Sequence, residues 1–167
     1  NTTIITSDYK SPGVENRLRN IGFNNILRVS ENVKEIGGVF HISSFRNEKF
    51  SLDDALYTIC TPDAAIIHAN DVWRKFPDDI VKKITNTLID INPNRRLYMS
   101  QTNIASGFPI IYNCFDEEEK TKLQKKHVSD IIKNGMQNAN NVGAHFFHSY
   151  AGMAVPFVKD KEKYLYS

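Results

Sequence analysis

The sequence predicts an α/β fold in which a mixed sheet is flanked by helices. Two observations lead to this prediction: short β-branched or apolar runs recur along the chain, and longer segments between them repeat apolar residues at helical spacing. The 167 residues suffice for one domain with a substantial core. A hydrophobic content of 41% and a charged content of 24% are ordinary globular values, which excludes a disordered chain. We expect a single domain over residues 1–167.

The first half of the chain is expected to be rich in strands. The expected strands cover residues 2–6, 26–29, 35–45, 53–61 and 64–68. Between the first two strands, Ser11 is the expected N-cap of a helix that has Pro12 at its first position and ends at Gly22. Gly37 and Gly38 mark a bend or turn near the start of the third strand.

The second half is expected to contain two longer helices, each followed by a strand. The first helix starts at residues 77–79 and stops at 92–94, and a strand over 96–99 follows it. The second and longest helix covers 116–141, has an acidic first turn, and precedes a strand over 144–150. The apolar sides of the two helices are expected to consist of Ile80, Val81, Ile84 and Leu88, and of Leu123, Val128, Ile131, Ile132, Met136 and Ala139.

The charge of the chain argues against nucleic-acid and membrane partners. The formal net charge is only +2, whereas binding to nucleic acid or to an anionic membrane needs a strongly basic face. The lysines within residues 120–126 and His127 are expected to form a solvent-facing side of the longest helix. No apolar run approaches the roughly 18 residues of a membrane span, and no secretory signal peptide is visible.

Two further features bear on where the protein works and on its extent. Cys60 and Cys114 are far apart and could form one disulfide, but we interpret them as reduced thiols of a cytoplasmic protein. The chain has no initiator methionine, and we expect it to be part of a longer protein.

The residues that point most clearly to chemistry follow the apolar run 64–67. His68, Asn70, Asp71 and Trp73 come directly after it, where the strand is expected to end. Enzymes of the α/β class place metal-capable and hydrogen-bonding side chains at such strand ends. Asp71 is therefore the candidate catalytic residue; the alternative is that it caps a turn or a helix.

Several short motifs occur in an order that resembles a known fold family. The first three motifs are Leu18-x-x-Ile21-Gly22-Phe23-Asn24-Asn25-Ile26, Glu35-Ile36-Gly37-Gly38-Val39 and His68-Ala69-Asn70-Asp71. The later ones are Phe108-Pro109-x-x-Tyr112, Phe115-Asp116-Glu117-Glu118-Glu119-Lys120 and Tyr150-Ala151-Gly152. Together, over residues 2–157, they resemble the second half of a metallo-β-lactamase-fold protein. The similarity points to the lactonase-like branch, and within it to the Rieske-associated members typified by CMP-N-acetylneuraminate hydroxylase.

The resemblance implies half of a four-layer αββα sandwich, in which a mixed sheet carries flanking helices. In that family each half supplies metal ligands from loops at one edge, and one or two transition metal ions, zinc or iron, are bound there. By resemblance, the metal ligands of this chain are Asp71, His68, His41 and His148. The metal would activate water for hydrolysis or dioxygen for oxygenation. The family's H-x-H-x-D-H motif is absent, so the resemblance also implies that this chain is a C-terminal portion whose N-terminal half lies elsewhere.

The candidate histidines also have simpler interpretations. His68 could be a hydrogen-bonded structural residue rather than a ligand. His41 lies about three residues before the position at which the family's middle histidine is expected. His145 and His148 should point to opposite faces of one strand, so at most one of them lines a site, and His148 is the better candidate.

The expected substrate-binding residues are Asn70, Trp73, Asn103, Ser106 and Tyr112. Asn103 and Ser106 lie in a polar, turn-forming stretch that could donate hydrogen bonds to a substrate or merely connect two elements. Trp73 could line a pocket or pack against the helix that follows it.

The main functional expectation is a metal-dependent hydrolase or oxygenase that acts on a small polar metabolite. The alternative is a catalytically degenerate binding or scaffold module of the same fold. Half of such a sandwich leaves one sheet face exposed and in need of cover. The expected macromolecular partner is therefore the missing N-terminal half or a second copy of the chain, and neither nucleic acid nor a membrane.

Overall fold

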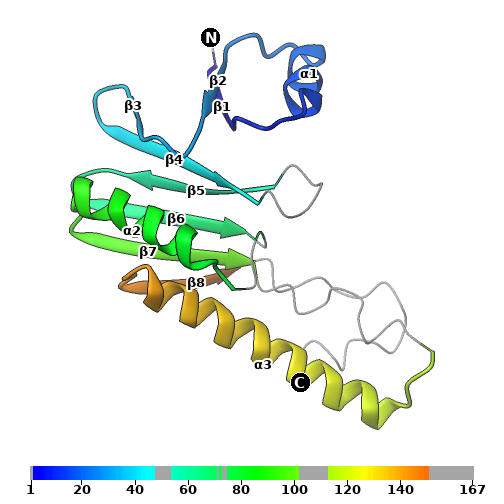
Figure 1. Ribbon diagram of the computed structural model, residues 1–167. Helices are drawn as coiled ribbons and strands as arrows, with labels where there is room; N and C mark the ends of the chain where they lie inside the picture. The colour runs from blue at the N-terminus through cyan, green and yellow to red at the C-terminus, as the bar shows by residue number, and fades with distance from the viewer. Residues whose placement is uncertain (1, 48–53, 71, 73–74, 102–112, 151–167) are drawn as a thin grey trace.

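The structure of the chain, a computed structural model, describes residues 2–47, 54–70, 72, 75–101 and 113–150 (Figure 1). It is an α/β structure with a mixed sheet and, within these residues, three helices. None of the described helices combines the length and the apolar character that crossing a membrane requires. The α/β class predicted from the sequence is confirmed.

The structure contains eight described strands and three described helices. Their bounds are β1 (Ile4–Ser7), α1 (Gly13–Asn20), β2 (Ile26–Val29), β3 (Lys34–Ile36), β4 (Phe40–Arg46), β5 (Ala55–Cys60), β6 (Ala64–Asn70), α2 (Asp78–Ile91), β7 (Arg95–Gln101), α3 (Glu117–Asn141) and β8 (Phe146–Tyr150). The first helix begins one residue later than predicted, because Pro12 is its cap residue. Ser11 still contributes, since its Oγ accepts a hydrogen bond from the Gly13 N–H (3.2 Å).

Six of the strands form one sheet in the order β3-β4-β5-β6-β7-β8. Neighbours from β3 to β6 are antiparallel, whereas β6, β7 and β8 are parallel to one another. Parallel neighbours need a crossover connection. Helix α2 connects β6 to β7, and α3 lies between β7 and β8. The strands β1 and β2 form a separate parallel pair joined through α1.

The stretch 35–45, predicted as one strand with a bend near its start, is two strands of a hairpin. The backbone of Gly37 has φ 63° and that of Gly38 has φ 70°, both in the left-handed region. Tight hairpin turns need positive φ at both central residues, which glycine adopts without a steric cost. The prediction was therefore right about the position of the turn and wrong about the continuity of the strand.

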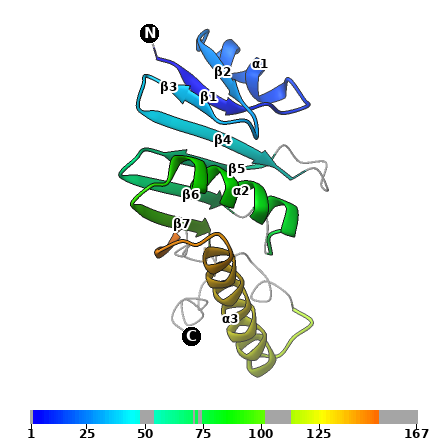
Figure 2. The same cartoon turned by 60° about the vertical axis from the view of Figure 1, so that its left-hand side comes forward.

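Helix α2 lies against one face of the six-stranded sheet in both views, and α3 meets the sheet next to β8 with its C-terminal end while its N-terminal part extends beyond the sheet (Figures 1 and 2). The fully buried residues of the core on this face are Phe45, Leu56, Cys60, Ile67, Ile84, Leu88, Tyr98 and Val142. The predicted apolar side of α2 is confirmed, since Ile80, Ile84 and Leu88 are all buried. We call this surface of the sheet the helix-covered face.

The apolar stripe predicted for helix α3 is confirmed only in part. Ala139 is buried and Leu123, Val128 and Ile131 are half-buried, whereas Ile132 and Met136 are exposed. Lys120, expected to face solvent, is buried, and His127 is half-buried rather than exposed. The buried residues of α3 are Lys120, Gln124, Gly135, Asn138 and Ala139.

The close approach of α3 to β8 explains this orientation of the helix. A Cβ atom added to Gly135 would lie 3.0 Å from Cζ of Phe147, which is tighter than ordinary van der Waals contact. The Phe147 ring in turn stacks on Tyr98, with ring centroids 5.9 Å apart. Because Gly135 faces β8, Asn138 faces the sheet one turn later.

The opposite face of the sheet carries a continuous apolar row. Partnered residues of adjacent strands point to the same face, so the register defines the row. From β4 to β8 it consists of Ile42, Ile59, Ile66, Leu97 and Phe146. Ile66 is 36% exposed and Phe146 is 59% exposed, whereas Ile67, the next residue of β6, is fully buried under the helices. We call this surface the helix-free face.

The unit of β1, α1 and β2 contacts the main sheet at its β4 end. The hydroxyl of Tyr57 accepts a hydrogen bond from the Ser7 N–H (2.9 Å), and Ser44 Oγ bonds to Ser7 Oγ (2.8 Å). Arg46 forms an ion pair with Asp8 (3.3 Å). These polar contacts place the end of β1 against residues of the helix-free face that lie outside the apolar row.

Candidate functional site

His68 lies near the carboxyl end of β6, on the helix-free face. The register places it between Tyr57 of β5 and Met99 of β7, and Met99 is beside His148 of β8. Tyr57, His68, Met99 and His148 thus form a second row on this face. It runs beside the apolar row, because His68 lies two residues after Ile66 on β6. The His68 ring lies 5.3 Å from the Tyr150 ring, measured between centroids, with a tilt of 30°.

Asn70, the last residue of β6, has an unusual backbone. Its φ is 50°, and the pairing of β6 with β7 shifts register between His68 and Asn70. Such a bulge bends the strand and changes the direction of the side chain. Two neighbours hold Asn70: Ser100 Oγ donates to its carbonyl (3.2 Å), and the Tyr150 hydroxyl donates to its Oδ1 (2.9 Å).

Beyond Asn70, the chain is held again at two described points. Asn47 Nδ2 donates to the carbonyl of Val72 (2.8 Å), and Asn138 Oδ1 accepts from the N–H of Phe76 (3.0 Å). Both asparagines are buried. Burial raises the pKa of the Tyr98 hydroxyl, which lies 3.4 Å from Asn138 Nδ2.

The register separates the candidate histidines. His41 is beside Cys60, whose neighbour on β6 is Ala65, and both of these residues belong to the helix-covered face. His41 therefore points to the face opposite that of His68. His148 shares the face of His68 but lies two strands away, which is about 10 Å between Cα atoms.

Five of the predicted site residues, Asp71, Trp73, Asn103, Ser106 and Tyr112, lie outside the described residues. Within the described ranges, no three His, Cys, Asp or Glu side chains come close enough to hold a metal ion. His68 lies three residues before Asp71 in sequence, and it is the predicted ligand with described contacts at this strand end. The described side chains alone do not fit a metal site; a site built on His68 needs Asp71 and donors from elsewhere.

Sequence reasoning did not assign Ser100, Tyr150, Asn47 or Asn138 to the site. They come from β7, from β8, from the end of β4 and from α3, and they meet only through the tertiary fold. Two sequence signals drew attention to some of them: the motif Tyr150-Ala151-Gly152, and the polar, turn-forming stretch 100–109, which begins at Ser100.

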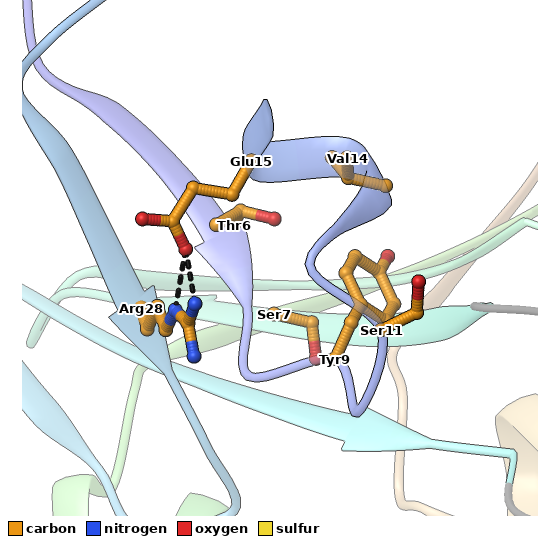
Figure 3. A pocket seen from close by; sticks show the side chains of 7 residues that line it. All are labelled: Thr6, Ser7, Tyr9, Ser11, Val14, Glu15 and Arg28. Atoms are coloured by element: carbon orange, nitrogen blue, oxygen red, sulfur yellow. Dashed lines mark hydrogen bonds and ion pairs between the residues drawn. The ribbon is translucent and has the colours of Figure 1, made fainter. Parts of the chain in front are cut away.

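A small hollow lies elsewhere, between the end of β1 and the start of α1 (Figure 3). It offers about 10 Å³ of space for water, enough for about one molecule. Glu15 lies at its edge and pairs with Arg28 and Arg19, which lower the pKa of its carboxyl. Glu15 carries one negative charge against the two positive charges of its arginine partners, and the hollow is too small for anything larger than about one water molecule.

The two cysteines differ in environment and both are free thiols. Cys60 is buried on the helix-covered face, and burial raises the pKa of its thiol to about 11. Cys114 is exposed. We call His68, Asn70, Ser100 and Tyr150 the strand-end cluster. Neither thiol belongs to it.

Comparison with known proteins adds no family assignment. No protein-family model matches the chain, and no curated protein matches its sequence. The geometry of the two sheet faces and of the carboxyl end of β6 is therefore the basis for a functional proposal.

Proposed function

We propose that this chain forms one sheet layer of a metallo-β-lactamase-like αββα sandwich. The observation that carries the proposal is the contrast between the two sheet faces. One is covered by α2 and the C-terminal end of α3. On the other, the row is buried at Ile42, half-buried at Ile59 and Leu97, and exposed at Ile66 and Phe146. Two sheets that pack face to face bury such inner rows between them, with helices on the outer faces.

The strand end next to this row is where the proposed chemistry lies. His68, Asn70 and Tyr150 lie at the carboxyl edge, beside the apolar row, and Asp71 follows in sequence. In the proposed site, Asp71 and His68 hold one or two zinc or iron ions together with donors from a second layer. A metal ion in such a site acts as a Lewis acid and lowers the pKa of bound water.

The second layer comes from the N-terminal half of the same fold or from another copy of the chain. His41 points to the helix-covered face, so it is not among the ligands in this proposal. The substrate is a small polar metabolite, hydrolysed or oxygenated at the edge between the layers. Substrate contacts are proposed for Asn70, Trp73, Asn103, Ser106 and Tyr112.

Native mass spectrometry with elemental analysis of the complete protein tests the metal site. We expect one or two zinc or iron ions per molecule, lost in Asp71→Ala together with hydrolytic or oxygenase turnover. Asp90→Ala is the matched control, because Asp90 is an exposed carboxylate on α2. Full metal content and activity in Asp71→Ala would sink the enzyme proposal.

A pair of charge substitutions tests the second layer. Ile66→Glu places a carboxylate in the apolar row, and Ile89→Glu places one on the exposed side of α2. If the helix-free face is covered in the complete protein, Ile66→Glu destabilises it by several kcal/mol because the charge is buried without a partner. Ile89→Glu should change stability by less than about 0.5 kcal/mol. Equal effects of the two substitutions would contradict the layer proposal.

A second candidate function is a metal-free binding or scaffold module of the same fold. The observation that favours it is the position of His41 on the face opposite His68, which leaves the described ligand set incomplete. A complete protein that holds no metal yet binds a partner chain or a small polar molecule would establish this candidate over the enzyme.

A further inference from the structure

The strands β1 and β2 form a two-stranded parallel sheet, which rarely stands alone. Parallel strands normally belong to larger sheets with both faces covered, and a lone pair of strands is marginally stable at best. On one face of this pair, Glu15 of α1 pairs with Arg28 of β2 (Figure 3). Helix α1 has no buried residue, and Ile21 at its end is 72% exposed. The pair therefore lacks part of the cover that parallel strands usually have.

The other face of the pair points to the main sheet and is covered only near β4. Ser7 Oγ bonds to Ser44 Oγ of β4, and Ile5 points to the same side as Ser7 because side chains alternate along a strand. The register places Leu27 beside Ile5 and Val29 beside Ser7. Val29 is 1% exposed, Leu27 is half-buried and Ile5 is 36% exposed. Cover thus decreases away from β4, as it also does along the apolar row of the helix-free face.

The outer edge of β1 carries backbone groups that a further strand could pair with. The N–H groups of Ile4 and Asp8 donate to carbonyls in and next to β2 (2.9 Å each). Backbone groups alternate in direction along a strand, so the N–H and C=O of Ile5 point away from β2. The N–H of Ser7 points the same way, and the Tyr57 hydroxyl accepts it. Within the described residues, no backbone group pairs with those of Ile5.

This edge has none of the features that keep strand edges from pairing. Proteins protect sheet edges with very short strands, charged side chains or proline. The edge strand β3 of the main sheet has three residues, of which Lys34 and Glu35 are charged. In contrast, residues 2–7 contain only threonine, isoleucine and serine, without charge or proline. The composition of β1 therefore suits a strand with a neighbour on both sides.

We infer that the outer edge of β1 pairs with an extended, uncharged strand of the N-terminal half, so that β1 and β2 belong to the sheet of the second layer. The inference rests on the proposed function, and it states where the second layer joins this chain. Its support is continuity, because β1 and β2 already contact the helix-free side of the main sheet at β4 and β5. A second copy of the chain fits less well, since it would bring its own apolar row and leave two rows in need of cover.

Amide hydrogen exchange of the complete protein, read by NMR, tests the pairing directly. We expect the Ile5 amide to exchange at least 100-fold more slowly than in the unfolded chain. Thr6, whose N–H points toward β2, is the internal reference for a paired amide of the same strand. Protection of Thr6 without protection of Ile5 would overturn the inference.

Two substitutions at one position separate the backbone pairing from the side chain. Ile5→Pro removes the outward N–H and leaves the N–H groups that face β2 in place. Ile5→Thr is the matched control, because it keeps the N–H and a β-branched side chain. In the complete protein, we expect Ile5→Pro to speed exchange of the Thr6 amide at least tenfold, and Ile5→Thr to change it by less than about threefold. Equal effects of the two substitutions would contradict pairing at this edge.

The same proteins distinguish the occupants of the edge and the fate of the layer proposal. A dimer in native mass spectrometry that Ile5→Pro converts to monomers would make a second copy the occupant and overturn the inference. An unprotected Ile5 amide, together with strong destabilisation by Ile66→Glu, would overturn the pairing at β1 and leave the second layer intact. A harmless Ile66→Glu would overturn the layer proposal and this inference with it.

Discussion

The two faces of the six-stranded sheet both carry large apolar residues, but these residues are covered to different degrees. On the helix-covered face, Ile67 and Tyr98 are completely buried beneath α2 and α3. On the helix-free face, Ile66 and Phe146 are as apolar, yet they remain 36% and 59% exposed. Ile42, at the β4 end of the same row, is buried, so the row is exposed mainly toward β8. Monomeric proteins rarely expose large contiguous apolar patches, and this contrast is the basis of the proposed second layer.

Neighbouring isoleucines of β6 provide the sharpest test of this comparison. Ile67→Ala should lower the free energy of unfolding by about 2–5 kcal/mol, because it opens a cavity in a closed core. Ile66→Ala should cost about 1 kcal/mol in this chain alone. In the complete protein its cost should approach that of Ile67→Ala. Urea unfolding of both variants, in this chain alone and in the complete protein, measures the two free energies. A loss of only about 1 kcal/mol for Ile66→Ala in the complete protein would show that the helix-free face is not covered there.

The contact between α3 and β8 tests how tightly the helix-covered face is closed. Gly135→Ala gains about 1 kcal/mol of helix propensity and loses about 2 kcal/mol by crowding Phe147, a net loss of about 1 kcal/mol. The sign should reverse when the same substitution is made in a Phe147→Ala background, where the ring is absent. Thermal unfolding of the four proteins measures the cycle. The same sign in both backgrounds would show that the ring does not limit the approach.

Thiol reactivity compares the closed core with an exposed surface. At pH 8, Cys60 should react with a thiol reagent at least 100-fold more slowly than Cys114, because its pKa of about 11 leaves little thiolate and its sulfur is buried. Burial favours the protonated thiol, so its contribution to stability is complete below pH 9 and is lost as the pH rises through 11. Mass spectrometry of the labelled protein gives both rates; comparable rates would mean that the cover of Cys60 opens readily.

The smallest expected effect concerns the hydrogen bond between Tyr150 and Asn70, at the carboxyl ends of β8 and β6. Tyr150→Phe removes the hydrogen bond to Asn70 and should cost about 1 kcal/mol, because the amide is half-buried and can be partly hydrated instead. Urea unfolding measures this loss. Tyr57→Phe, which removes the hydroxyl that accepts from the Ser7 N–H, is the matched control on β5, three strands from Tyr150 on the same face. No loss in Tyr150→Phe alone would show that Asn70 does not depend on β8.

Much of the fold could be predicted because the elements carry strong local patterns. Residues 26–29 match β2, and the acidic first turn places the start of α3 at Asp116, whose side chain accepts from the Glu119 N–H. The orientation of α3 could not be predicted, because it depends on a glycine and on a buried asparagine. Hydrophobic periodicity gives no weight to either residue.

The candidate site was predictable only where its residues are contiguous. His68 and Asn70 could be located because they follow one apolar run. Tyr150 and Asn47 reach the same place through strand register and loop geometry, which a single sequence does not reveal. The face to which His41 points depends on which side of the sheet receives the helices, and that is decided by the crossovers after β6.

The change from antiparallel to parallel pairing at β6 has a consequence for the order of folding. The strands from β3 to β6 are joined by short connections, so they can pair through local contacts that form fast. The strands β7 and β8 join only after α2 and then the 25-residue α3 have passed over the sheet, which costs more loop-closure entropy. During synthesis the meander can therefore assemble while β8 is still within the ribosome. Ser100 and Tyr150 lie on the two strands that follow the crossovers, so we expect their hydrogen bonds to Asn70 to form after the antiparallel strands have paired.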